Sequence, residues 1–334
     1  MLRRNLIDML KIKTFPRIHI SLIGMNNDGY RINGGIGFSI ASPNLYISFD
    51  SAISNNIIDK REHGFTFEEL ERLKCHLDRV IMNKRFAVRV NCVVHESIIQ
   101  SHVGFGSNTM IYLACVEALF ILNGQEYTDD DILSISGRGG TSGIGINTYF
   151  RGGFVFDTGI VNQDRRGLAP SSEFVNKILD KPLLVKELVL PHWDLGVCIP
   201  VIKRKTEDEE KTFFQKCCPI EKKSVEAILY EVVYGITSSL MENDFRVFCK
   251  SIDAIQCTKW KFLERDTYGE QLLAVEESIR EAGAECVGMS SLGPLLYFFG
   301  KDIDVIVNRV KQDMPQCVCF KTAFNNKGRL VEND

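Results

Sequence analysis

Alternation of apolar and polar residues with a period of two is the main pattern in the N-terminal part of the chain. Residues 17–24 (RIHISLIG) alternate in this way, which predicts a β-strand. The Asn-Asn-Asp-Gly sequence at 26–29 predicts a turn, and the runs at 35–41 and 45–49 predict two further strands. Residues 86–94 carry an equally clear strand pattern. This part of the chain is therefore predicted to be rich in β-strands.

Helical periodicity appears next and recurs along the chain. In residues 67–82, leucine and isoleucine side chains return to one face at a spacing of three or four. The almost wholly apolar run 110–120 predicts a buried helix, and the aspartates at 129–131 predict the capped first turn of a short helix. Residues 221–242 and 269–283 are also helical in pattern.

The rest of the chain mixes both patterns. Strand patterns occur at 154–157, 188–190, 196–202, 295–300 and 317–322, and a helical pattern at 305–310. The polar residues 162–185 and the charge run 205–211 predict loops. We therefore predict an α+β fold with mixed β-sheets packed against helices, divided near residue 185 into an N-terminal domain (1–185) and a C-terminal domain (186–334).

Composition narrows the class of protein. Of the 334 residues, 45% are hydrophobic and 25% charged, so the chain can bury a sizeable core. The net charge of -3 comes without a basic stripe, which argues against nucleic acid as a partner. No apolar segment is long enough to predict a membrane span. The eleven cysteines include no Cys-x-x-Cys pair, which favours the reduced thiols of a cytoplasmic protein over disulfides or a metal site.

A first glycine-rich segment, Gly104-Phe-Gly106-Ser107-Asn108-Thr109, lies between a predicted strand and the buried helix. Glycines let a backbone approach an anion closely, and the start of a helix offers free N–H groups. The three polar side chains add hydrogen-bond donors. The segment therefore predicts a seat for phosphate or pyrophosphate, with a tight turn that binds nothing as the alternative. It is not a Walker loop, because no Gly-Lys-Ser/Thr follows.

Two histidines lie close to this chemistry. His102 comes just before the glycine segment, where it is a candidate to contact a phosphate or to act as acid or base. His19 follows Arg17 on an amphipathic strand. For both histidines a purely structural hydrogen bond is the competing interpretation.

A second glycine-rich segment covers residues 137–145 and has five glycines in nine residues. So many glycines destabilise regular structure, which favours a ligand-binding role over a simple turn. Arg138 supplies a planar fork of donors suited to phosphate or carboxylate. The binding residues predicted from this segment are Arg138, Gly139, Gly140, Thr141, Ser142 and Gly143.

The order of these motifs resembles a known family. The matching strings are Arg17-Ile-His19, Asn33-Gly-Gly35-Ile-Gly37, His102-x-Gly-x-Gly-Ser107, residues 137–145, Gly152-Gly153-Phe, Pro170-Ser-Ser172, Cys218-Pro219 and Gly288-Met-Ser290-Ser291-Leu-Gly-Pro294. Together they resemble the beta-ribofuranosylaminobenzene 5'-phosphate synthases of methanopterin biosynthesis, which have the two-domain fold of the GHMP kinase superfamily. Related enzymes make C-nucleosides such as formycin and pyrazofurin from the same sugar donor.

The resemblance implies a reaction. Phosphoribosyl pyrophosphate (PRPP) would lose pyrophosphate, an aromatic carboxylate would attack C1 of the ribose through a ring carbon, and carbon dioxide would leave. Magnesium would be required, and the protein would form a homodimer. Asp157, His102 and Arg138 are then expected to be catalytic. Arg17 and His19 are expected to hold the acceptor carboxylate, and Gly35, Ser290 and Ser291 to line the substrate site.

The chain also departs from the family pattern. Asn33 stands where the family commonly has aspartate, Asn108 replaces a glycine of the first segment, and Thr158 replaces a glycine after Asp157. These differences leave the acceptor open between a benzoate and a heteroaromatic acid.

Two other functions stay open at this stage. The superfamily consists mostly of ATP-dependent small-molecule kinases, whose second motif carries an aspartate that here corresponds to Gly145. A glycine cannot take a proton from an accepting hydroxyl, which argues against a kinase. A ligand-binding protein without catalysis is the second alternative.

Overall fold

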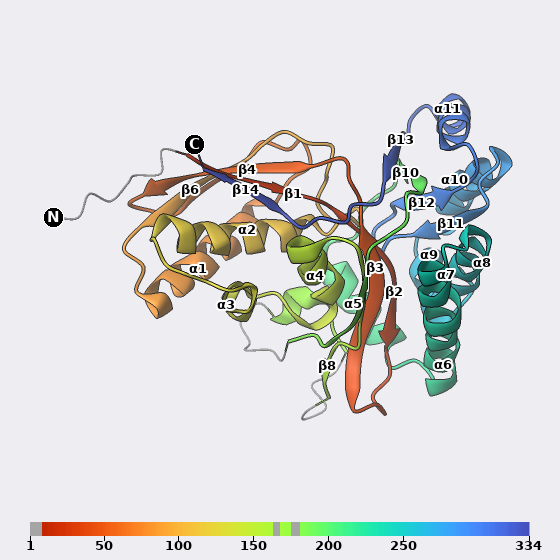
Figure 1. Ribbon diagram of the computed structural model, residues 1–334, viewed down its shortest axis with the longest axis horizontal. Helices are drawn as coiled ribbons and strands as arrows, with labels where there is room; N and C mark the ends of the chain where they lie inside the picture. Colours follow the sequence, from red (N-terminus) through yellow and green to blue (C-terminus); the bar gives the residue numbers. More distant parts are fainter. Residues whose placement is uncertain (1–8, 163–167, 175–180, 334) are drawn as a thin grey trace.

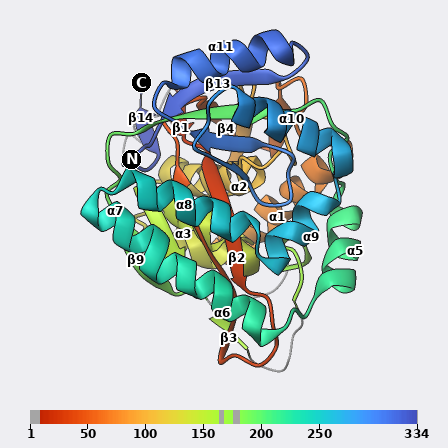
Figure 2. The same cartoon turned by 90° about the vertical axis from the view of Figure 1, so that its right-hand side faces the viewer.

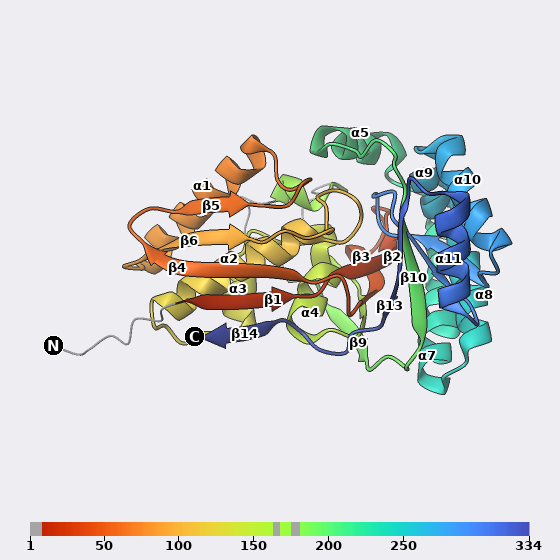
Figure 3. The same cartoon turned by 90° about the horizontal axis from the view of Figure 1, so that it is seen from above.

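The first of three β-sheets holds both ends of the described chain. The computed structural model describes residues 9–162, 168–174 and 181–333. The strand order in this sheet is β14 (Leu330–Asn333), β1 (Leu10–Thr14), β4 (Leu45–Ala52), β6 (Arg89–Val94) and β5 (Asn56–Asp59). Helices α1 (Phe67–Lys84), α2 (Ser107–Leu122) and α3 (Asp129–Ile135) lie against one face of it (Figure 1). The strands run side by side when seen from above (Figure 3), with β5 and β6 parallel and the other neighbours antiparallel.

The second sheet forms the middle of the molecule. Its order is β2 (Arg17–Gly24), β3 (Arg31–Ser39), β7 (Phe154–Asp157) and β9 (Leu184–Leu188), and β8 (Ile160–Val161) pairs with the start of β3. Helix α4 (Gly143–Arg151) packs on β3 and β7. On the other side lie α6 (Lys222–Tyr230), a π-helical stretch (Glu231–Thr237) and α7 (Ser238–Glu242), which cross in front of β2 in Figure 2.

The third sheet has the order β11 (Cys286–Met289), β12 (Leu296–Phe299), β10 (Asp194–Ile199) and β13 (Val318–Ala323). Four helices belong to this part: α8 (Phe245–Gln256), α9 (Lys259–Asp266), α10 (Gly269–Glu281) and α11 (Ile303–Asp313). Helix α5 (Glu207–Cys217) lies between β10 and α6 in the chain. In the part of the chain that the structure describes, no helix combines the length and the apolar character needed to cross a bilayer.

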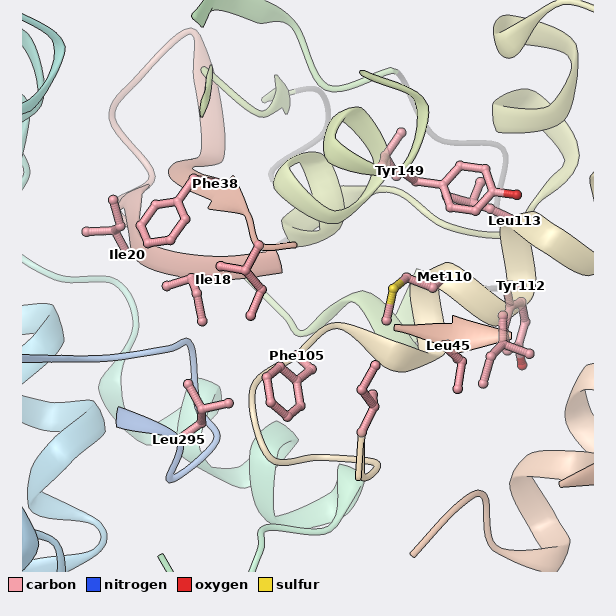
Figure 4. Close-up of a cluster of buried hydrophobic side chains, with 14 of the residues drawn as sticks. Ile18, Ile20, Phe38, Leu45, Phe105, Met110, Tyr112, Leu113, Tyr149 and Leu295 are labelled. Carbon is pink, nitrogen blue, oxygen red and sulfur yellow. The ribbon is translucent and has the colours of Figure 1, made fainter. Parts of the chain in front are cut away.

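The hydrophobic core ties the first glycine segment to the second sheet. Phe105, between the two glycines of that segment, is fully buried. Its ring lies in one cluster with Ile18 of β2, Phe38 of β3 and Leu295, as Figure 4 shows. The neighbouring residues of the segment are thereby held at fixed positions, while their polar groups face away from the core.

The predicted α+β class is confirmed, and most predicted elements are present with shifted ends. The strand predicted at 35–41 begins earlier, at Arg31, and the strand predicted at 188–190 shares only Leu188 with β9. The loop predicted for the charge run at 205–211 is wrong, because these residues begin α5. Thr206 caps α5 by accepting from the Glu209 amide, while the Glu209 carboxylate accepts from the Thr206 amide.

Several elements had no prediction. β1, β5, β14, α8 and α9 were not recognised from the sequence. The proposed division of the chain near residue 185 stays a prediction. β9 runs across that position, and β14 returns to pair with β1 at the other end of the molecule.

Candidate active site

The first glycine segment folds as a tight turn into the N-terminus of α2. Gly104 and Gly106 have φ angles of 119° and 75°, in the region that favours glycine. A Cβ atom on Gly104 would lie 2.7 Å from the Ser290 carbonyl oxygen, and one on Gly106 would lie 3.0 Å from Nε of Arg17. The close packing of this turn therefore requires both glycines.

The start of α2 is left open for a ligand. Gly106 is the N-cap and offers no side-chain hydrogen bond, and the first turn contains no acidic residue. The first N–H groups of a helix lack partners within the helix, and the helix dipole favours negative charge there. The side chains of Ser107, Asn108 and Thr109 surround this point and line a cleft. The local geometry is that of an anion-binding site.

The cleft lies where the first glycine segment, the second glycine segment, α5 and residues 290–293 meet. Its cavity volume is about 120 Å³. The residues that line it are Arg17, His19, Leu22, His102, Gly104, Gly106, Ser107, Asn108, Thr109, Arg138, Thr141, Ser142, Gly145, Pro170, Ser171, Glu207, Glu210, Phe214, Ser291, Leu292 and Gly293.

Arg138 joins the two glycine segments. Its Nη2 atom donates to the hydroxyls of Thr109 and Ser142 at 3.1 Å each, and to that of Ser171 at 2.9 Å. The guanidinium lies 5.6 Å from the ring centre of Tyr112. Within the described residues no carboxylate forms an ion pair with it. Burial lowers the pKa of Arg138 from its ordinary value.

Arg17 is a second arginine without a carboxylate partner in the described part of the chain. Its Nη1 atom donates to the Gly104 carbonyl oxygen at 2.5 Å. Its backbone N–H donates to the Phe105 carbonyl oxygen at 3.1 Å. Burial lowers its pKa to about 10, and the nearby positive charge of Arg138 adds to this effect. Two cations that repel each other in one cleft are best stabilised by a bound anion.

Glu207 and Glu210 line the cleft, and Glu69 lies beside it. His102 Nε2 is 2.6 Å from Oε1 of Glu69, and its Nδ1 is 3.9 Å from Glu210. Glu207 is paired with Arg72 at 2.5 Å. Ligand atoms of Glu69, His102 and Glu207 lie within 4.8 Å of one another, a separation that allows all three to reach one metal ion.

The charge of His102 is set by these neighbours. Burial disfavours the protonated ring, but the nearby Glu210 carboxylate and the hydrogen bond to Glu69 outweigh it and raise the pKa of His102 to about 10. Burial likewise disfavours the charged Glu69, but the hydrogen bonds from His102 and Thr66 lower its pKa to about 2. In the metal-free protein His102 is therefore a cation, which suits a charge partner better than a general base.

In the metal-free protein, we expect His102 to titrate well above pH 8, as measured by long-range ¹H–¹⁵N NMR of the ring. Changing Glu69→Gln should lower its pKa, because one anionic partner is lost. The stability that this ion pair contributes is complete between about pH 4.5 and 6.5, and it is lost as pH rises through about 10 or falls through about 2. Glu71→Gln is the matched control, since Glu71 pairs with Lys74. Titration of the wild-type ring near its ordinary value of about 6.5 would contradict this prediction.

His19 is placed in the cleft but differs from His102. It is 3% exposed, and its Nε2 atom has no hydrogen-bond partner among the described residues. That atom would lie 2.6 Å from a Cβ atom on Gly35, so the ring covers the glycine directly. Burial, followed by the charges of Arg17 and Lys261, holds the pKa of His19 well below its ordinary value. A neutral His19 can donate or accept one hydrogen bond to a ligand in the cleft.

Two serines predicted to bind substrate have different surroundings. Ser290 is fully buried and does not line the cleft. Its hydroxyl donates to the Gly104 carbonyl at 2.8 Å and accepts from the His19 amide at 3.0 Å, so it holds the turn and β2 together. Ser291, with a φ of 55°, does line the cleft.

Several residues predicted for the site lie outside the cleft lining. These are Gly35, Gly139, Gly143, Asp157 and Ser290, while the surroundings of Gly140 lie outside what the structure describes. Asp157 is 1% exposed, and its carboxylate lies 2.5 Å from where a Cβ atom on Gly143 would be. Burial raises the pKa of Asp157 to about 7. Its predicted catalytic role stays a prediction, and the structure places it beneath the second glycine segment.

The acidic residues in and beside the cleft were not predicted from the sequence. Glu69, Glu207 and Glu210 come from the first turns of α1 and α5. The available signal was the capping-box spacing, Thr66-x-x-Glu69 and Thr206-x-x-Glu209, which marks both helix starts.

The chain is similar to known proteins over most of its length. No protein-family model matches the chain. The beta-ribofuranosylphenol 5'-phosphate synthase of Archaeoglobus fulgidus is 31% identical over 333 residues, covering 97% of this chain and 100% of the relative. The protein of the same name from Methanothermobacter thermautotrophicus is 28% identical over 295 residues, covering 86% of this chain and 88% of the relative.

Solved structures of kinases share the fold. Mevalonate kinase from L. major in complex with R-mevalonate superimposes with a TM-score of 0.68 at 13% identity, covering 95% of this chain and 96% of that one. Mevalonate diphosphate decarboxylase from Staphylococcus aureus gives 0.67 at 13% identity, covering 98% of both chains. At this identity the likeness shows the fold alone. The chain is therefore a member of the beta-ribofuranosylphenol 5'-phosphate synthase family, built on the GHMP kinase fold.

Proposed function

We propose that this protein is a PRPP-dependent C-ribosyltransferase that joins an aromatic carboxylate to ribose 5'-phosphate with loss of carbon dioxide and pyrophosphate. The observation that carries the proposal is the pair of arginines, Arg17 and Arg138, which share one cleft with the open N-terminus of α2. A sugar with two phosphate-bearing ends needs two such anion seats. The names of the relatives, which specify a ribofuranosyl 5'-phosphate product, support the same class of substrate.

The proposed reaction needs charge stabilisation more than a strong base. The bond between C1 and the pyrophosphate oxygen breaks with its electron pair on the pyrophosphate. The ring carbon that bears the carboxylate forms a bond to C1, and the carbon–carboxylate bond then returns its electrons to the ring as carbon dioxide leaves. Arg138 and the α2 amides would bind the developing negative charge, which is usually the largest catalytic contribution.

Magnesium fits the donor set of the cleft. Glu207 lines the cleft and Glu69 lies beside it, and carboxylates are the protein ligands that Mg²⁺ prefers. Those carboxylates would repel a pyrophosphate, so a cation between them resolves an unfavourable pairing of charges. When bound, the ion would neutralise charge on the leaving group. Glu69 and Glu207 are the residues that would hold it.

The glycine at position 145 favours this reaction over phosphoryl transfer. Gly145 lines the cleft, where a kinase of this fold would need a side chain that positions the accepting hydroxyl. A Cβ atom at this position would lie 3.3 Å from Cγ2 of Thr109, which leaves little room for a carboxylate.

Homodimer formation and a cytoplasmic location remain predictions.

The protein incubated with PRPP, Mg²⁺ and an aromatic acid is expected to release pyrophosphate and carbon dioxide in equal amounts. The panel should include hydroxybenzoate, aminobenzoate and aminopyrazole carboxylates, with ¹⁴C in the carboxyl group to follow the carbon dioxide. Omission of either substrate is the control and should abolish both products. A parallel incubation with ATP and candidate alcohols tests the kinase alternative, and release of ADP there would contradict the proposal.

A further inference from the structure

Helices α2 and α4 begin next to each other at the cleft. Ser107 and Thr109 in the first turn of α2, and Gly145 in the first turn of α4, line the cleft. A Cβ atom on Gly145 would lie 3.3 Å from Cγ2 of Thr109, so the two first turns are in contact. Arg138 donates to the hydroxyls of Thr109 and Ser142, one beside each helix start. The position of α4 relative to α2 therefore sets the spacing of the two proposed anion seats.

A buried carboxylate joins the same two helices outside the cleft. Glu117 of α2 is 0% exposed, and its Oε2 atom accepts from the Tyr149 hydroxyl of α4 at 2.6 Å. Its Oε1 atom accepts from the Tyr127 hydroxyl at 3.0 Å and from Nη2 of Arg329 at 2.6 Å. Nε of Arg329 donates to both carboxylate oxygens, at 3.0 and 3.2 Å. None of these four residues lines the cleft, so the carboxylate links α2 to α4 without touching a substrate there.

The segment between β13 and β14 holds the end of α4. Residues 324–329 cross from the third sheet to the first (Figure 3). The Arg329 N–H donates to the Tyr149 carbonyl oxygen at 2.7 Å. A Cβ atom on Gly328 would lie 1.9 Å from the Phe150 carbonyl oxygen, so the segment passes directly against the last turn of α4. The last carbonyls of a helix have no partner within the helix, and this segment supplies one. It also brings the Arg329 side chain to the buried carboxylate.

The surroundings of these groups keep each of them in one protonation state. Burial, followed by the charge of Glu117, holds the pKa of Tyr149 well above its ordinary value, so its hydroxyl stays a donor. Burial disfavours the charged Arg329, but the hydrogen bond to Glu117 and the charge of that carboxylate outweigh it and raise the pKa of Arg329. The link between the two helices is therefore a permanent one at the pH values of an ordinary assay.

We propose that Glu117, Tyr149 and Arg329 are positioning residues that set the distance between the starts of α2 and α4, so that one substrate with two phosphate-bearing ends fits both seats at once. The inference rests on the proposed function. A buried polar network whose members are all paired rigidifies the elements that it joins. A ligand held at two seats gains affinity only while its length matches their separation. Displacement of α4 along α2 would therefore weaken the binding of PRPP more than that of pyrophosphate, which occupies one seat.

Tyr149→Phe tests this assignment, because it removes the hydroxyl that links α4 to Glu117 and keeps the ring. The Kd for PRPP, measured by isothermal titration calorimetry without an acceptor, should rise about ten-fold, and kcat/KM for PRPP should fall by a similar factor. The Kd for pyrophosphate should change less than about two-fold, because the hydroxyl is separate from both seats. Glu117→Gln is a second variant with the same expected direction, since it removes the charge of the acceptor and keeps its shape. A loss of stability alone would lower the midpoint of thermal unfolding and leave the ratio of the two Kd values unchanged.

Tyr127→Phe is the matched control. Tyr127 lies between α2 and α3 and donates to the same carboxylate at 3.0 Å, so this change removes one hydrogen bond to Glu117 without touching α4. Both Kd values should stay within about two-fold of the wild type. Arg329→Lys adds a rescue test. It keeps a positive charge beside Glu117 and should therefore retain more affinity for PRPP than Arg329→Gln.

The outcomes separate the two proposals. Turnover by the wild type, with an unchanged ratio of the two Kd values in Tyr149→Phe and Glu117→Gln, overturns the positioning role and leaves the ribosyltransferase standing. An equal shift of the ratio in Tyr127→Phe also overturns it. Absence of pyrophosphate release with every acid, together with a ratio that shifts in Tyr149→Phe alone of the two tyrosine variants, overturns the ribosyltransferase and retains two spaced anion seats. Absence of PRPP binding by the wild type overturns both proposals.

Discussion

Arg138→Gln is expected to lower kcat/KM for PRPP by about 10²- to 10³-fold, a loss typical for removal of one preorganised group that stabilises transition-state charge. The guanidinium donates to hydroxyls from three separate segments, which fixes its direction before substrate arrives. It has no carboxylate partner among the described residues, so its charge is available to the leaving group. Glutamine keeps a donor but removes the charge and the fork.

Arg151→Gln is the matched control for this experiment. Arg151 ends α4, half exposed, and pairs with Glu187 at 3.1 Å. Its removal should change kcat/KM less than two-fold, because exposed ion pairs contribute little. Thermal unfolding with and without PRPP adds a binding readout, since a ligand that binds the folded state raises its stability. Activity of Arg138→Gln within ten-fold of the wild type would contradict the role given to Arg138.

The largest effect on stability is expected for Lys261→Met, with a loss of about 3–5 kcal/mol in the free energy of unfolding. Lys261 and Glu264 are 0% and 1% exposed, and their charged groups are 2.5 Å apart. Lys261 also donates to the Met289 carbonyl oxygen at 2.7 Å. Met289 lies two residues before Ser291, which lines the cleft. Removing the lysine leaves a buried carboxylate and a buried carbonyl without partners.

Two further variants separate this explanation from simple loss of packing. Lys259→Met, at an exposed position of the same helix, should change stability by less than about 0.5 kcal/mol. Lys261→Met combined with Glu264→Met should recover most of the loss, because apolar side chains commonly replace a buried ion pair without penalty. Urea denaturation measures all three. An equal loss in the single and double variants would show that the ion pair is not the cause.

Local signals in the sequence singled out many of the residues that line the cleft, and their binding of an anion stays a prediction. The two glycine-rich segments, Arg138 and the helix after Gly106 are contiguous motifs, and their geometry follows from backbone rules that act over a few residues. Arg17 and His19 were also predicted for the site, and both line the cleft. The position of Asp157 was different: its strand was predicted, but the direction of its side chain relative to the second segment depends on how β7 pairs with β3.

The sequence by itself determined most of the strands and helices, the glycine segments and the family resemblance, because each of these is encoded by neighbouring residues. Only the tertiary structure decided which charged groups meet. Glu69 and Glu210 reach His102 from different helices, and Ser290 reaches Gly104 across 186 positions. Such contacts depend on how whole helices and strands pack together, so they cannot be predicted from the spacing of residues along the chain.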